Sequence, residues 1–117
     1  MTGSPQLNIN IEANSKDLNI KPQIYVRVLQ KAVLQTSQDI LALETALPVD
    51  DYDQVKAIAH KFKGDYDNLR ITDMSSLARQ IEDIAKNSRD KEKIAGLTQN
   101  FIGYFDQLKK IVEAQPS

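Results

Sequence analysis

Apolar residues recur at spacings of three and four along most of this 117-residue chain, which is the pattern of helices that bury one face. The first such stretch follows Pro22. Its periodic positions are Val26, Leu29, Val33, Thr36, Ile40, Leu43 and Leu47. Three more stretches follow, from 51 to 69, from about 72 to 86, and from about 91 onward. Four amphipathic helices joined by short turns predict an all-α fold, an up-and-down antiparallel four-helix bundle.

Prolines and short polar residues mark where these helices begin and end. Pro22 suits the first turn of a helix, and Pro48 ends the first stretch, which is either one long helix or two helices with a kink near 35–37. The residues predicted to cap the next two helices are Asp50 or Asp51, and Thr72 or Asp73. The buried faces predicted for the last two helices are Met74, Leu77, Ile81 and Ile84, and then Ile94, Leu97, Phe101, Tyr104 or Phe105, Leu108 and Ile111.

The first 16 residues lie outside the helical pattern. Leu7, Ile9 and Ile11 alternate with polar residues, which is a weak strand signal in a short segment rich in asparagine. We therefore predict an extended or mobile tail over 1–16, followed by the bundle over 17–115. A segment packed along the bundle is the alternative.

Composition narrows the classes of function. The chain is 41% hydrophobic and 26% charged, as soluble globular domains are, and it has no cysteine for a disulfide or a thiolate metal site. The formal net charge is −1 with both signs intermixed, so nucleic-acid binding is not expected. No apolar run reaches the roughly 18–20 residues that span a membrane, and no signal-peptide pattern appears. We expect a cytoplasmic monomer.

The only histidine, His60, lies off the apolar stripe of its predicted helix. That stripe consists of Val55, Ile58, Ala59, Phe62, Tyr66 and Leu69. At about 100° per residue the imidazole falls roughly on the opposite face, among polar residues. His60 is therefore predicted to be exposed rather than to be a core histidine.

The neighbours of His60 suit a ring that accepts and donates a phosphoryl group. Gly64 lies one turn further on the same face, where glycine costs about 0.5–1 kcal/mol relative to alanine, which indicates that something must approach closely. Lys63 is placed to reach an anion on the imidazole, and Lys56 to reach it from the other side. An imidazole with an ordinary pKa of about 6.5 is substantially neutral at cellular pH and keeps a lone pair for attack. Glu82, on the next helix, has no evident partner for acid–base chemistry.

With these residues in place, the sequence resembles the histidine-containing phosphotransfer (HPt) family of two-component phosphorelays over about residues 18–114. The family pattern is alanine, the phosphorylated histidine, any residue, an apolar residue, lysine, glycine and a small residue. The run Ala59-His60-Lys61-Phe62-Lys63-Gly64 matches it, whereas Asp65 departs at the last position and Arg70 stands where glycine commonly ends the helix. The flanking segments that also resemble the family are 51–55 and 77–82.

The resemblance implies a role as a phosphorelay intermediate. His60 would accept a phosphoryl group, through Nε2, from an aspartyl phosphate on a response-regulator receiver domain and pass it to another receiver. The implied partners are such receivers and a hybrid histidine kinase, with magnesium on the receiver and no cofactor on this chain. The predicted supporting residues are Lys63, Gly64 and Lys56, and the predicted docking residues are Asp53, Ala57, Lys61 and Asp67.

Other functions remain as alternatives. No nucleotide-binding motif is found, so the phosphate has to come from another protein. An interaction-only bundle would bind a receiver or another partner without accepting phosphate, and an accessory domain of a larger hybrid kinase would have its partner on the same chain. A metal-binding or hydrolytic enzyme is least favoured, because one histidine and no cysteine do not make a typical zinc site.

Overall fold

The computed structural model describes residues 5–116, and this part of the chain is helical apart from its turns and an extended segment at the start. The elements are α1 (Ile11–Asp17), α2 (Pro22–Ala46), the short 3-10 helix η1 (Leu47–Val49), α3 (Tyr52–Asn68), α4 (Thr72–Lys86) and α5 (Lys91–Glu113). The all-α class is confirmed. The first long helix is continuous, so the alternative of two helices with a kink does not apply.

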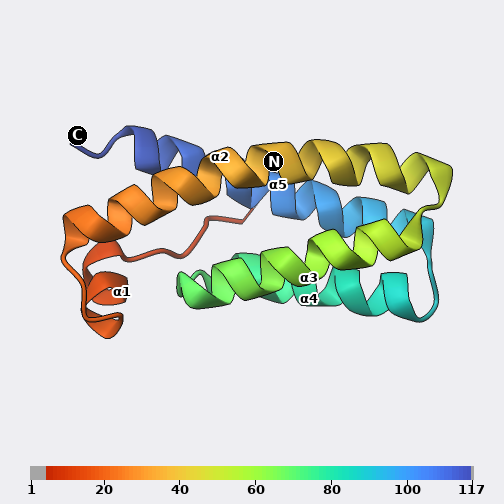
Figure 1. Ribbon diagram of the computed structural model, residues 1–117, viewed down its shortest axis with the longest axis horizontal. Coiled ribbons are helices and arrows are strands. Elements are labelled where there is room, and N and C mark those ends of the chain that lie inside the picture. Colours follow the sequence, from red (N-terminus) through yellow and green to blue (C-terminus); the bar gives the residue numbers. More distant parts are fainter. Residues whose placement is uncertain (1–4, 117) are drawn as a thin grey trace.

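The four long helices form a bundle in which α2 contacts α3 and α5, and α4 contacts α3 and α5. Successive long helices reverse direction at each turn, and α1 lies beside the N-terminal end of α2 (Figure 1). The pair α3 and α4 has the most extensive contact of any two helices. It is also the pair that carries the residues around His60.

The core is built from the stripes that the periodicity predicts. All six residues of the α3 stripe are buried. Phe62 stacks on Phe101 of α5 with ring centroids 4.6 Å apart, and Tyr66 meets the same ring edge-on at 5.9 Å. The Tyr66 hydroxyl shares a 2.6 Å hydrogen bond with Thr36 of α2, and burial raises the pKa of Tyr66 to about 12, so this phenol stays neutral. These contacts fix the rotation of α3 and leave His60 facing outward.

The buried face of α4 is rotated from the predicted one. Met74 and Ile81 are buried as expected, but Leu77 and Ile84 are only half-buried. The small residues Ser75, Ala78 and Ala85 are buried in addition. Small side chains let two helix backbones approach closely, which accounts for the position of this face against its neighbours. On α5 a similar shift buries Thr98 and Val112, while Leu97, Tyr104 and Ile111 are half-buried.

Helix ends agree with the predicted boundaries, but one predicted cap is wrong. Asp51 caps α3 by accepting a hydrogen bond from the Gln54 amide at 3.2 Å. The helix α4 begins at Thr72 as predicted, yet neither Thr72 nor Asp73 caps it. The Asp73 carboxylate instead accepts a hydrogen bond from the Asn8 amide at 2.8 Å, because the N-terminal segment passes over this end of α4.

That N-terminal segment is packed, so the mobile-tail prediction fails over its described part and the alternative holds. Leu7 is buried in the core, and residues 11–17 form α1 instead of extended chain. The Gln107 side chain of α5 accepts a hydrogen bond from the Leu7 amide at 2.7 Å and donates one to the Pro5 carbonyl at 2.8 Å. Residues 1–4 lie outside the described part.

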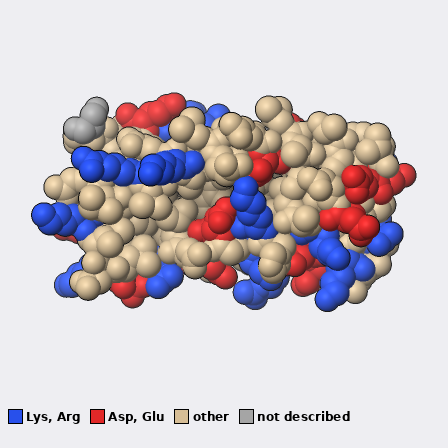
Figure 2. Space-filling model, in the orientation of Figure 1, with Lys and Arg blue, Asp and Glu red and all other residues tan. Residues whose placement is uncertain are grey.

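The surface is mixed in charge. Basic and acidic side chains alternate with uncharged surface over the face drawn in Figure 2, in keeping with the formal net charge of −1. Within residues 5–116, no helix has the length and apolar character needed to cross a bilayer.

Candidate functional site

His60 lies in the middle of α3 with 68% of its side chain exposed, in agreement with the register of the helix. The buried stripe packs α3 against the core, so the imidazole on the other face projects from the surface instead of lying in a cleft. Two other helices flank it, α2 on one side of α3 and α4 on the other. Solvent and a partner protein can both reach the ring.

The Glu82 carboxylate of α4 connects His60 to Lys63. Its Oε2 lies 2.8 Å from His60 Nδ1, and its Oε1 lies 2.9 Å from Lys63 Nζ. Sequence reasoning assigned Glu82 no partner, and the structure corrects this. A signal was present, because His60 and Glu82 are each eleven residues from Ile71, in the turn between two antiparallel helices. Residues equidistant from such a turn face each other.

The environment of Glu82 keeps its carboxyl ionised. Only 16% of the side chain is exposed, and this partial burial acts to raise the pKa of the carboxyl. Hydrogen bonds from Lys63 and His60, together with the positive charge of Lys63, outweigh burial and leave the pKa of Glu82 below its ordinary value. An ionised carboxylate can only accept hydrogen bonds, so Nδ1 of His60 is the nitrogen that carries the proton. In the neutral ring, Nε2 then has the free lone pair.

Gly64, one turn after His60, opens the space beside the imidazole. A Cβ atom built at this position would have nothing within 4 Å, so no packing inside the molecule requires glycine there. Nor does the backbone, because the left-handed positions among residues 5–116 are Asn19, Asp50, Arg70 and Arg89, none of them glycine. Glycine in a helix costs about 1 kcal/mol relative to alanine. The structure therefore leaves open space at Gly64, and its role in the approach of a partner stays a prediction.

The remaining predicted site residues surround His60 without converging on it. Lys61 turns toward α2, where its Nζ lies 2.8 Å from the Asp39 carboxylate. Asp53 is exposed and lies 3.8 Å from Arg89. Ala57 and Asp67 are exposed, and Lys56 is half-buried with no carboxylate within 4.0 Å among the described residues. Their roles in docking and support stay predictions.

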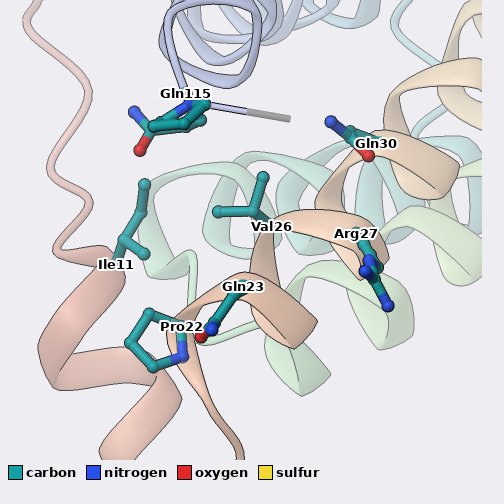
Figure 3. A pocket seen from close by; sticks show the side chains of 8 residues that line it. Ile11, Pro22, Gln23, Val26, Arg27, Gln30 and Gln115 are labelled. Carbon is teal, nitrogen blue, oxygen red and sulfur yellow. The ribbon is translucent and has the colours of Figure 1, made fainter.

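A cavity of about 510 Å³ is formed by residues other than these (Figure 3). It lies between the start of α1, the first turns of α2 and the C-terminal residues Gln115 and Pro116. Its floor is apolar, with Ile11 and Val26, and its rim carries glutamine side chains. None of its lining residues belongs to α3 or α4. His60 therefore lies outside this cavity, on the exposed surface of α3.

The family model described as Hpt domain matches residues 27–114 of the chain. This match covers most of the sequence, and the chain belongs to the Hpt domain family. No curated protein and no solved structure matches it. The family match begins within α2, so α1 and the segment before it lie outside the matched region.

Proposed function

We propose that this protein accepts a phosphoryl group on Nε2 of His60 from the aspartyl phosphate of a receiver domain and passes it to a second receiver. The observation that carries the proposal is the hydrogen bond between Glu82 and His60 Nδ1 at 2.8 Å. It leaves Nε2 as the free nitrogen, on a side chain that is 68% exposed and stands beside the open space at Gly64.

In the transfer step, Nε2 of the neutral imidazole attacks the phosphorus of the aspartyl phosphate in line with the aspartyl oxygen. The N–P bond forms, the P–O bond to the aspartyl group breaks, and the aspartate leaves as a carboxylate. The phosphorylated ring becomes a cation, because Nδ1 keeps its proton. Glu82 stabilises this cation through the charge-assisted hydrogen bond that already holds the ring. The reverse reaction delivers the group to a second receiver.

The other parts of the site act by position and charge. A loose phosphoryl-transfer transition state needs mainly alignment and neutralisation, which a rigid antiparallel four-helix bundle provides. Lys63 and Lys56 stabilise the negative charge of the transferring phosphoryl group. The missing side chain at Gly64 leaves room for the partner protein. The proposal assigns the magnesium ion to the receiver domain, and contacts with that domain to Asp53, Ala57, Lys61 and Asp67. A hybrid histidine kinase is the proposed source of the phosphate, in the cytoplasm.

The proposal is tested by incubating the protein with a panel of purified receiver domains of the source genome, each carrying radiolabelled phosphate. We expect label on the wild type that is lost in acid and survives alkali, which identifies phosphohistidine. His60→Gln should keep the fold, because the side chain is exposed, and should carry no label. Label on His60→Gln would contradict the assignment. Binding of a receiver without any labelling would favour the interaction-only bundle.

A further inference from the structure

The cavity at the N-terminal end of α2 is built from three segments that are far apart in the sequence. They are the start of α1, the first turns of α2 and the residues that follow α5. Only two of its described lining residues, Arg27 and Gln30, lie within the region 27–114 that the family model matches. The cavity therefore depends on parts of this chain that the family model does not match.

The size and walls of the cavity suit a small molecule. Its volume of about 510 Å³ lies within the range of about 300–1,000 Å³ that is usual for small-molecule sites. Val26 forms part of its apolar floor and is only 8% exposed. Pro22 and Pro116 also line it, and the proline ring fixes φ at both positions. The walls are therefore largely formed before a ligand enters.

The polar groups of the cavity carry one positive charge. Among the described residues that line it, Arg27 is the only charged one, and no carboxylate of residues 5–116 forms an ion pair with it within 4.0 Å. Gln23, Gln30 and Gln115 add side-chain amides, and Figure 3 shows Gln30 and Gln115 on either side of Val26. A guanidinium group matches the two oxygens of a carboxylate. The lining therefore favours a ligand with a negative charge.

We propose that this cavity binds a small amphipathic carboxylate, a molecule with one carboxylate and an apolar chain or ring. The carboxylate pairs with Arg27, and the apolar part packs against Ile11, Pro22 and Val26. The site is separate from His60, because no described lining residue belongs to α3 or α4. It adds a binding function to the phosphotransfer function and does not rest on it.

The experiment titrates octanoate into the isotope-labelled full chain and follows the amide chemical shifts. We expect a single saturable site, with shift changes concentrated at residues 11–30 and 111–116. Arg27→Gln should raise the dissociation constant for octanoate about fivefold, as the loss of an exposed ion pair implies. Lys31→Gln is the matched control, because Lys31 is an exposed cation of the same helix that does not line the cavity. It should bind octanoate as the wild type does.

Octanol separates the charge of the ligand from its apolar chain. It has no carboxylate, so it should bind the wild type more weakly than octanoate does, and Arg27→Gln should leave its affinity unchanged. Weaker octanol binding by Arg27→Gln would mean that the arginine acts through packing, which would overturn the carboxylate assignment. Val26→Phe fills the cavity and should weaken the binding of both probes.

Three further results would contradict the proposal. The first is a titration of the wild type with octanoate that shows no saturable change. The second is equal weakening of octanoate binding by Arg27→Gln and Lys31→Gln, because that would be a general effect of the charge of the protein. The third is wild-type affinity for octanoate in Val26→Phe, because the ligand would then lie elsewhere. None of these measurements depends on whether His60 accepts phosphate.

Discussion

At the scale of single residues, one carboxylate organises the site. Glu82 has two hydrogen-bond partners, His60 at 2.8 Å and Lys63 at 2.9 Å, so each of its oxygens is occupied. The arrangement gives the imidazole a fixed orientation and a defined proton position while its outer edge stays in solvent. Lys63 offsets the charge of Glu82, which would otherwise repel an approaching phosphate. The reactivity assigned to His60 therefore depends on a residue of a different helix.

The role of Glu82 is tested by Glu82→Gln. The amide keeps the shape but removes the charge that stabilises the phosphorylated ring, and we expect phosphoryl transfer to slow about tenfold. Nitrogen chemical shifts of His60 should show the proton mainly on Nδ1 in the wild type and a more even distribution in the variant. Asp83→Asn changes the adjacent carboxylate and is the control. Transfer by Glu82→Gln at the wild-type rate would contradict the role.

The same carboxylate predicts a pH dependence of stability. Contacts with Lys63 and His60 leave the pKa of Glu82 lower in the folded protein than in the unfolded chain. The unfolded state then takes up the proton first as pH falls, so the stabilisation from Glu82 is present above the ordinary glutamate pKa and is lost as pH drops through the folded value. Denaturant unfolding between pH 7 and pH 3 should show a smaller loss of stability for Glu82→Gln than for wild type. Identical slopes would exclude this contribution.

At the scale of the elements, the helix ends are formed without glycine. After α3, the Arg70 amide bonds to the Asp67 carbonyl at 3.0 Å and the Ile71 amide bonds to the Tyr66 carbonyl at 2.9 Å, which is the Schellman arrangement. Arg70 takes the left-handed conformation there with φ 63°. Its guanidinium lies 2.6 Å from the Asp17 carboxylate of α1, so the residue that replaces the family's glycine also joins two helices.

Two variants separate the backbone strain at Arg70 from its ion pair with Asp17. Arg70→Gly relieves the left-handed strain, about 1 kcal/mol, and loses an exposed ion pair of about 0.2–1 kcal/mol. Asp17→Asn loses the ion pair alone. We therefore expect Arg70→Gly to have a free energy of unfolding equal to or above that of Asp17→Asn in urea denaturation. An Arg70→Gly protein less stable than Asp17→Asn would show that the arginine contributes through other contacts.

At the scale of the whole molecule, the N-terminal segment packs against the bundle and is hydrogen-bonded to three of its helices. Its backbone is tied to α5 through Gln107 and to α4 through Asp73. The Asn14 side chain donates to the Tyr25 hydroxyl at 3.0 Å and so connects α1 to α2. The N-terminal residues in these contacts lie outside the region that the family model matches, so this segment adds to the matched bundle in this chain.

The contribution of this segment is measured by Leu7→Ala. Leu7 is 4% exposed and packs into the core, so its truncation should lower the free energy of unfolding by about 2 kcal/mol or more. Leu34→Ala at an exposed position should change it by less than about 0.5 kcal/mol. Loading of His60 from phosphoramidate, a small phosphoryl donor, should be unchanged in both. A loss for Leu7→Ala as small as that for Leu34→Ala would mean that the segment packs only weakly.

Some of this protein followed from the sequence by itself. The three-four spacing of apolar residues gave the long helices and, on α3, the side on which His60 lies, because helical geometry depends only on local backbone angles. Proline at 22 and the aspartates at 50 and 51 marked helix starts for the same local reason, and Asp51 is the one that caps. The motif around His60 indicated the family, which the match over residues 27–114 shows.

The tertiary structure decided the rest. Which carboxylate meets His60, where Leu7 is buried, and why small residues face inward on α4 all depend on the rotation and offset of packed helices. Periodicity within one helix gives no distance to the next, so the contact between Glu82 and His60 was not predicted, although their equal distance from the turn at Ile71 was a signal of it. The sequence determined the four long helices and the apolar face of α3, because these depend on local helical geometry. Only packing decided that residues 11–17 form a helix, which face of α4 is buried and which side chains meet between helices.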